Sequence, residues 1–192
     1  CLLLSCRMRH YTRSGERSNR VLELYLGGAR SGKSRLAEAR ALASGLPHTY
    51  IATATAEDAE MAARIAHHRQ QREGQGWHTI EAPEALSNAL VNHAQAGHCV
   101  LVDCLTLWLS NWLSREDESL WQSVRDEFLR TLQTLPGQVI LVSNEVGQGV
   151  VPMGELSRRF VDESGRLHQA IAAQADRVVL VTAGLEQVLK ES

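Results

Sequence analysis

The most constraining feature of the sequence is the stretch GGARSGKS, from Gly27 to Ser34, which separates an apolar run from an Ala/Leu/Arg-rich one. It matches the pattern Gly-x-x-x-x-Gly-Lys-Ser, in which the glycines let several backbone N–H groups converge on one phosphate. The run VLELYLGG before it predicts a strand, and KSRLAEARALASG after it predicts a helix that stops at Gly45. Strand, glycine-rich loop and helix in this order predict a phosphate-binding loop.

Each position of this loop has an expected role. We predict that Lys33 is a catalytic residue that reaches the β- and γ-phosphate oxygens of a nucleotide, and that the Ser34 hydroxyl ligates Mg²⁺. The start of the following helix adds a favourable field for an anion. The nucleotide contacts predicted in the loop are Gly27, Gly28, Ala29, Arg30, Ser31, Gly32, Lys33 and Ser34.

A carboxylate at the end of a neighbouring strand is also needed, and CVLVDC supplies Asp103. An unpaired carboxylate at the end of a buried strand is costly, so a functional role explains its position. We therefore predict that Asp103 binds Mg²⁺ directly or through water, the alternative being a helix cap or turn residue. The two motifs together predict nucleotide binding and no narrower activity.

The rest of the chain alternates strand and helix patterns. Further strands are predicted in HTYIATATA, WHTIEAP, HCVLVD, QVILVSN and DRVVLVTAG, the last of which we expect to be the final strand. Apolar strands separated by helices predict an α/β fold with a mostly parallel sheet, helices on both faces and ligands at the carboxyl ends of the strands. We expect one P-loop NTPase (RecA-like) catalytic domain over residues 20–192, after a disordered extension at 1–19.

Composition and charge exclude several classes of protein. The 192 residues allow one domain with a sizeable core, and the net charge of −2 gives no general attraction for nucleic acid. No stretch is apolar enough to span a bilayer. Cys99 and Cys104 flank an apolar run, and the absence of zinc-binding spacings favours buried thiols. We expect a cytoplasmic protein with neither nucleic-acid partner nor membrane insertion.

Five stretches narrow the function further: GGARSGKS, IATATAEDAEMAARIAHHR, WHTIEAPE, LVDCLTLWLSN and VSNEVGQGVVP. Together they resemble the bifunctional adenosylcobinamide kinase / adenosylcobinamide-phosphate guanylyltransferase family of cobalamin (vitamin B12) biosynthesis, over residues 22–184. The resemblance implies phosphorylation of the aminopropanol hydroxyl of adenosylcobinamide by ATP or GTP. It then implies transfer of GMP from GTP to that phosphate, which yields adenosylcobinamide-GDP and pyrophosphate. A corrinoid substrate and a homotrimer are implied as well.

The resemblance also implies that GMP passes through a covalent guanylyl-histidine, carried by His67, the first histidine of the pair. A neutral imidazole has a ring lone pair that can attack the α-phosphorus. On a helix, Glu60 and Arg64 share a stripe with either His67 or His68, and the two adjacent rings diverge by about 100°. Without the resemblance, two histidines near a helix end are most simply solvent-facing residues that favour the helix dipole.

Further nucleotide contacts follow from the resemblance, namely Ala52, Thr53, Ala54, His68, Arg69, Gln70, Gln71, Glu81 and Asp103. Glu81 is expected to accept hydrogen bonds from guanine or ribose, the alternative being an ordinary exposed acid. Asn144 and Glu145 end another strand at the ligand-binding edge, where GQG is predicted to lie over a large substrate. The tryptophans of LWLSNWL are interpreted as core residues, the alternative being an apolar surface for the corrinoid or for a subunit contact.

The sequence alone leaves two other functions open. One is a simple P-loop kinase of another small alcohol, in which both histidines are incidental. The other is a nucleotide-binding module without catalysis.

Overall fold

The computed structural model describes residues 20–56, 59–115 and 117–192, without the side chains of Glu60 and Arg64. The predicted extension at 1–19 lies outside these residues. The described strands are β1 (Val21–Gly27), β2 (His48–Ala52), β3 (His78–Glu81), β4 (Cys99–Asp103), β5 (Gln138–Asn144), β6 (Arg177–Thr182) and β7 (Leu185–Glu191). The described helices are α1 (Lys33–Ala43), α2 (Ala59–Arg72), α3 (Leu86–His93), α4 (Leu105–Leu113), α5 (Glu118–Thr134) and α6 (Glu155–Gln174).

The strands form one sheet in the order β3-β2-β4-β5-β1-β6-β7. Neighbours from β3 to β6 pair in parallel, and only the β6–β7 pair of this sheet is antiparallel. The register places Gly27 opposite Asn144 and Ala52 opposite Asp103. The carboxyl ends of the central strands therefore meet at one edge, as predicted.

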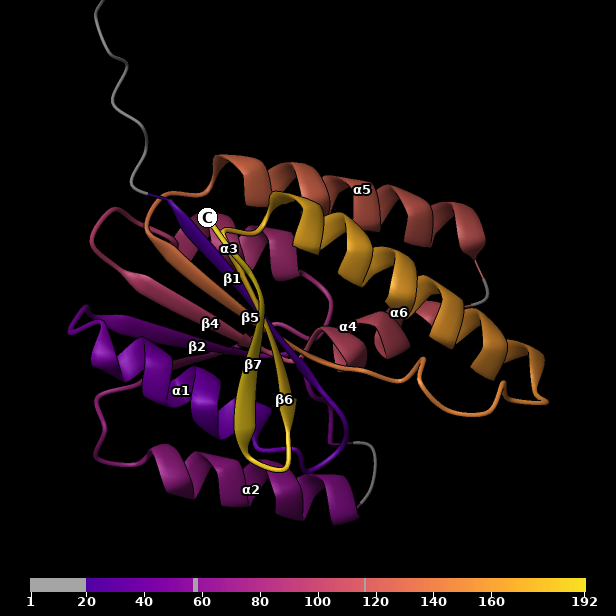
Figure 1. The fold of residues 1–192 in the computed structure, drawn as a ribbon, viewed down its shortest axis with the longest axis horizontal. Helices are drawn as coiled ribbons and strands as arrows, with labels where there is room; N and C mark the ends of the chain where they lie inside the picture. Colours follow the sequence, from indigo (N-terminus) through magenta and orange to yellow (C-terminus); the bar gives the residue numbers. More distant parts are fainter. Residues whose placement is uncertain (1–19, 57–58, 116) are drawn as a thin grey trace, which may run out of the picture.

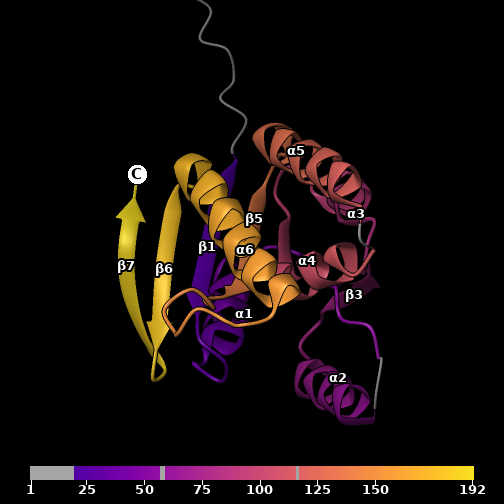
Figure 2. The same cartoon turned by 90° about the vertical axis from the view of Figure 1, so that its right-hand side faces the viewer.

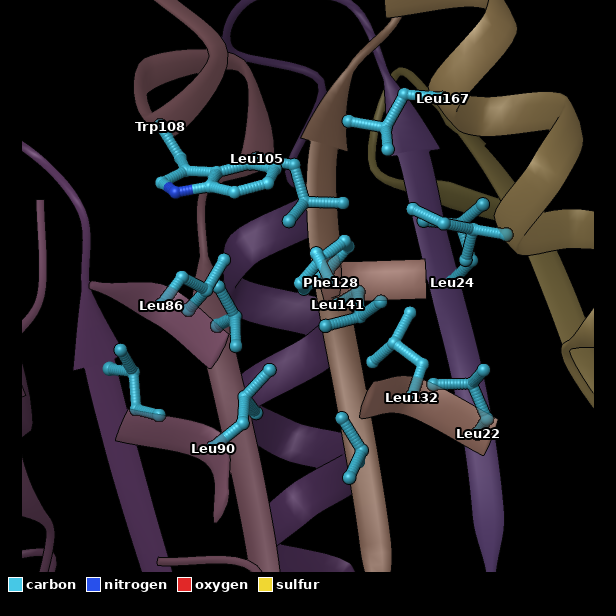
Figure 3. Close-up of a cluster of buried hydrophobic side chains, with 14 of the residues drawn as sticks. Leu22, Leu24, Leu86, Leu90, Leu105, Trp108, Phe128, Leu132, Leu141 and Leu167 are labelled. Carbon is cyan, nitrogen blue, oxygen red and sulfur yellow. The ribbon is translucent and has the colours of Figure 1, made fainter. Parts of the chain in front are cut away.

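Helices cover both faces of the sheet, which confirms the predicted fold class (Figures 1 and 2). On one face α3, α4, α5 and α6 pack against alternate strand residues, as Figure 3 shows for Leu24, Leu141 and Phe128. On the other face Ala37 and Ala41 of α1 pack near Tyr25 of β1. Each buried large apolar side chain contributes about 1.5–3 kcal/mol, so this core fixes the sheet that carries the site.

Two elements were not predicted from the sequence. The helix α4 follows β4 directly, and its periodicity is hidden because Leu105, Trp108 and Leu109 are buried within a nearly continuous apolar run. The strand β7 lies beyond the predicted last strand. Ala183 and Gly184 both have positive φ, of 52° and 78°, which suits a two-residue hairpin turn between β6 and β7. Because β7 is an exposed edge strand, it lacks the apolar pattern of the others.

The described part of the chain includes no helix that is both long and apolar enough to cross a bilayer. The prediction of buried thiols is confirmed, since Cys99 and Cys104 are both free and buried. Burial raises the pKa of the Cys99 thiol to about 12 and that of Cys104 to about 11. Neither thiol is therefore suited to act as a nucleophile.

Candidate nucleotide site

The loop between β1 and α1 has the geometry of a phosphate cradle. A Cβ at Gly27 would lie 2.5 Å from Ser31 Oγ and 2.6 Å from the Val181 carbonyl oxygen, so no larger residue fits there without a shift. Gly32 has a φ of +94°, in the left-handed region that favours glycine. The Gly184 N–H donates to the Ser31 carbonyl over 2.8 Å, so the β6–β7 turn braces the loop.

The first turn of α1 has the features of an anion-binding site. Of the described side chains, none caps the helix at Gly32, and its first turn holds no acid. The first N–H groups of a helix have no intrahelical acceptor, and they attract phosphate. The Lys33 ammonium donates to the Gly28 carbonyl over 3.1 Å, so the side chain lies back across the loop.

A cavity of about 190 Å³ opens next to this loop, and it brings together Lys33, Ser34 and Asp103. Its other lining residues come from β2, α2, α4 and the ends of β4 and β5: Tyr50, Ala52, Ala54, Met61, Ile65, His68, Arg69, Arg72, Cys104, Leu107 and Asn144. We call this space the phosphate cavity. Residues predicted separately from the loop, from the strand ends and from the histidine helix thus share one site.

Ser34 and Asp103 fit a magnesium ion, because hydroxyl and carboxylate oxygens are ligands that Mg²⁺ prefers. The Tyr50 hydroxyl donates to Asp103 Oδ2 over 3.1 Å and fixes the orientation of that carboxylate. Burial, and then the charge of Asp103, hold the pKa of Tyr50 well above its usual value, so the phenol keeps its proton. Within the described residues no group of three or more His, Cys, Asp or Glu side chains is placed so that it could hold a metal ion. Most ligands of the ion would therefore come from phosphates and water, as is usual for Mg²⁺.

The segment after β2 shows a division of roles. Ala52 and Ala54 line the phosphate cavity, whereas Thr53 is fully buried between them. The Thr53 hydroxyl donates to the Cys104 carbonyl over 2.6 Å and accepts from the Cys104 N–H over 2.8 Å. The Thr53 side chain therefore locks this segment to the end of β4, and contact with a nucleotide is left to its neighbours and to the backbone.

The cavity-facing stripe of α2 consists of Met61, Ile65, His68 and Arg72, spaced as neighbours on one helix face. His68 is half-buried, whereas His67 is exposed and lies outside the set of described residues that line the cavity. The ring centroids of the two histidines are 6.1 Å apart. The predicted stripe through Glu60 and Arg64 depends on side chains outside the described ones.

A second space, of about 670 Å³, lies between α2 and β3 and is called the outer cavity. Arg69 lines both cavities and forms an ion pair with Glu81, and each of these two side chains is more than half exposed. Gln70 lines the outer cavity, together with Trp77. Gln71 is exposed, and its side chain is not among the described residues that line either cavity.

At the end of β5, the side chains of Asn144 and Glu145 have different surroundings. Asn144 lines the phosphate cavity. Glu145 accepts from the Gly147 N–H over 2.7 Å, and its Oε2 lies 3.9 Å from Nδ1 of His168 on α6. Only the first of the two predicted residues therefore has its side chain at the phosphate cavity.

Five side chains of the site were not singled out from the sequence, namely Tyr50, Met61, Ile65, Arg72 and Leu107. Tyr50 lies two positions before Ala52 in a strand, so the alternation of β2 places both on one side. Arg72 lies four positions after His68, one helical turn away on the same face. These spacings are the features of the sequence that could have indicated Tyr50 and Arg72 as site residues. The prediction of a core role holds for Trp108, which is fully buried and donates to the Glu84 carbonyl over 3.0 Å.

The glycine-rich loop after β1, the helix that starts at Lys33 and the aspartate that ends β4 define a P-loop NTPase of the RecA-like type. A solved structure with a similar fold is that of the RadB recombinase, with a TM-score of 0.50 and 16% identity, over 83% of this chain and 73% of that one. At this level of identity the likeness shows the fold alone.

Comparison with protein families identifies the particular enzyme. The model of the family "cobinamide kinase / cobinamide phosphate guanyltransferase" matches residues 23–189. The bifunctional adenosylcobalamin biosynthesis protein CobP of Pseudomonas aeruginosa is 57% identical over 88% of this chain and 96% of its own length. The corresponding protein CobU of Escherichia coli is 39% identical over 88% of this chain and its full length.

The chain therefore belongs to the cobinamide kinase / cobinamide phosphate guanylyltransferase family, and it is a bifunctional enzyme of cobalamin biosynthesis. The resemblance found in the sequence is confirmed. Neither a simple kinase of another small alcohol nor a module without catalysis describes this family.

Proposed function

We propose that this enzyme phosphorylates the aminopropanol hydroxyl of adenosylcobinamide and then transfers GMP from GTP to the new phosphate through a histidine of α2. The observation that supports both steps is the shared phosphate cavity, which Lys33, Asp103 and His68 all line. A kinase step needs only the loop and the carboxylate. The adjacent histidine helix adds a nucleophile for a second, covalent reaction.

In the kinase step, the loop N–H groups and Lys33 hold the β- and γ-phosphates of ATP or GTP. The substrate hydroxyl oxygen bonds to the γ-phosphorus, the bond from that phosphorus to the β–γ bridging oxygen breaks, and the hydroxyl proton passes to solvent. Ser34 and Asp103 would hold Mg²⁺, which when bound neutralises phosphate charge. Tyr50 keeps the Asp103 carboxylate oriented for this task.

In the guanylyl-transfer step, a ring nitrogen of His67 attacks the α-phosphorus of GTP. A P–N bond forms while the bond to the α–β bridging oxygen breaks, and pyrophosphate leaves with that electron pair. A phosphate oxygen of adenosylcobinamide phosphate then attacks the same phosphorus, and the P–N electron pair returns to the imidazole. Lys33 and the loop N–H groups stabilise the charge on the leaving pyrophosphate.

We propose that the nucleotide extends from the phosphate cavity into the outer cavity. The phosphate cavity is smaller than the roughly 300–1,000 Å³ typical of small-molecule sites, so it suits the phosphates alone. In the outer cavity Glu81 can accept from guanine N–H groups. An exposed ion pair contributes only about 0–1 kcal/mol, so guanine can displace Arg69 from Glu81 and leave Arg69 to contact a phosphate.

We propose that the enzyme is a homotrimer, as the sequence resemblance implies. Exposed apolar side chains that an interface would cover occur in residues 150–156 and in β7, including Val150 and Met153, each 96% exposed, and Leu185, 74% exposed. Sedimentation equilibrium is expected to give about three times the chain mass of 21.2 kDa. A mass equal to that of one chain would contradict the trimer.

The decisive experiment for the two-step function is covalent capture. Incubation with α-labelled GTP and Mg²⁺ is expected to leave label on the protein that is lost in acid and stable in base, as a phosphoramidate requires. Adenosylcobinamide phosphate should then release the label as adenosylcobinamide-GDP. Protein that phosphorylates adenosylcobinamide and transfers GMP but never carries label would disprove the covalent route and favour direct transfer.

A further inference from the structure

The last residue of α2, Arg72, is held in an unusual environment. Its guanidinium lies 3.5 Å from the ring centroid of Tyr50, and the side chain is only 5% exposed. Its Nη1 lies 3.6 Å from Glu38 Oε1 on α1. A cation stacked on an aromatic face and paired with an acid is well fixed when it is excluded from water. The end of the histidine helix is thereby fastened to β2 and to α1.

The contacts of Arg72 extend through Tyr50 to Asp103, the carboxylate proposed to bind Mg²⁺. Tyr50, whose ring carries Arg72, donates its hydroxyl to Asp103 Oδ2 over 3.1 Å. The ring of Trp77 packs edge-on against Tyr50, with centroids 5.8 Å apart. One tyrosine ring therefore supports both the helix that carries the histidines and the carboxylate that serves the phosphates.

Stability alone does not account for this arrangement. Within the described residues, Nε and Nη1 of Arg72 are buried and have no hydrogen-bond partner, which is costly for a charged group. Burial raises the pKa of the Glu38 carboxyl, and the charge of Arg72 offsets only part of that rise. A buried ion pair of this kind is often no more stable than apolar residues of the same volume. A role in positioning explains why these charges occupy the site.

We propose that Arg72 and Tyr50 form a positioning pair: Arg72 sets the distance of the histidine helix from the phosphates, and Tyr50 orients Asp103 beneath it. The inference rests on the proposed guanylyl transfer through α2. The pair acts on the two reactions differently. Arg72 affects the step that needs a histidine nucleophile, whereas Tyr50 affects both steps because both use Asp103.

Four variants test the pair, each assayed for guanylyl-protein formation at saturating GTP and for ATP-dependent phosphorylation of adenosylcobinamide. A misplacement of about 1 Å costs about 100-fold in rate. Arg72→Met is therefore expected to slow protein labelling by roughly 30- to 100-fold, and to slow phosphorylation at least about tenfold less than labelling. Arg72→Lys keeps the charge but not the planar face, so it should resemble Arg72→Met. The matched control is Arg130→Met, which replaces an exposed arginine on α5 and should alter neither rate.

Tyr50→Phe is the complementary variant, since it keeps the ring under Arg72 and removes only the hydrogen bond to Asp103. Labelling and phosphorylation should fall together, by about tenfold each, and both should need more Mg²⁺ for half-maximal rate. A merely structural role for Tyr50 would not change the Mg²⁺ requirement.

Three results would overturn the inference. They are equal losses of both activities in Arg72→Met, no loss of labelling in that variant, or full labelling restored by Arg72→Lys. If Arg72→Met fails to fold, as judged by its thermal unfolding, Arg72→Lys provides the same comparison of labelling with phosphorylation. Wild-type protein without any label would instead refute the proposed guanylyl-histidine, and this inference with it.

Discussion

Replacement of Lys33 by alanine is expected to lower adenosylcobinamide phosphorylation by about 10²–10³-fold, because a single positioned donor to developing phosphate charge has an effect of this size. The structure supports a direct role, since Lys33 starts α1, lies across the loop and lines the phosphate cavity. Guanylyl transfer should fall as well, because in the proposed mechanism the same lysine stabilises the leaving pyrophosphate. The measurement is kcat and KM for each half-reaction at saturating Mg²⁺.

The chain offers a matched control in Lys190. That side chain donates to the carbonyls of Ala172 and Ala173 at the end of α6, away from the phosphate cavity. Lys190→Met should leave both activities nearly unchanged. An active Lys33→Ala enzyme would contradict the assignment of the loop, whereas loss of only one activity would show that the two reactions use different phosphate sites.

The loop and the strand ends were predictable because their chemistry is local in sequence. The positions of Gly27 and Gly32 depend on steric limits within a few residues. Asp103 ends an apolar parallel strand, so it reaches the same sheet edge as the loop, although β5 lies between β4 and β1 where the sequence analysis expected a directly neighbouring strand. Each of these constraints depends on residues within one short segment of the sequence. The family resemblance rested on the same segments and was confirmed by the family model.

The positioning pair was not predictable, because it depends on the meeting of two distant segments. Nothing near Tyr50 indicates that an arginine will stack on its ring, and nothing near Arg72 specifies a tyrosine. Similarly, β7 is defined by its pairing with β6 more than by its own exposed residues. Tertiary contacts decide such features, and one sequence carries only the weak signal of helical or strand spacing.

The second large effect is expected for His67→Ala, which should abolish guanylyl-protein formation while phosphorylation of adenosylcobinamide by ATP changes by less than about threefold. The reason is that the alanine side chain has no lone pair to form the P–N bond, whereas the kinase step as proposed uses no histidine. Label incorporation from α-labelled GTP, measured beside ATP-dependent phosphorylation, tests both halves of this statement.

His68→Ala is the informative companion variant, because His68 rather than His67 lines the phosphate cavity. For His67 to reach the α-phosphorus, α2 must turn by about 100° about its axis. Because Arg72 holds the last residue of α2 against Tyr50 and Glu38, this turn must be taken up in the part of the helix before Arg72. We therefore expect His68→Ala to bind GTP more weakly but to keep its label. Loss of label in His68→Ala and its retention in His67→Ala would assign the covalent role to His68, with α2 already in its reactive orientation.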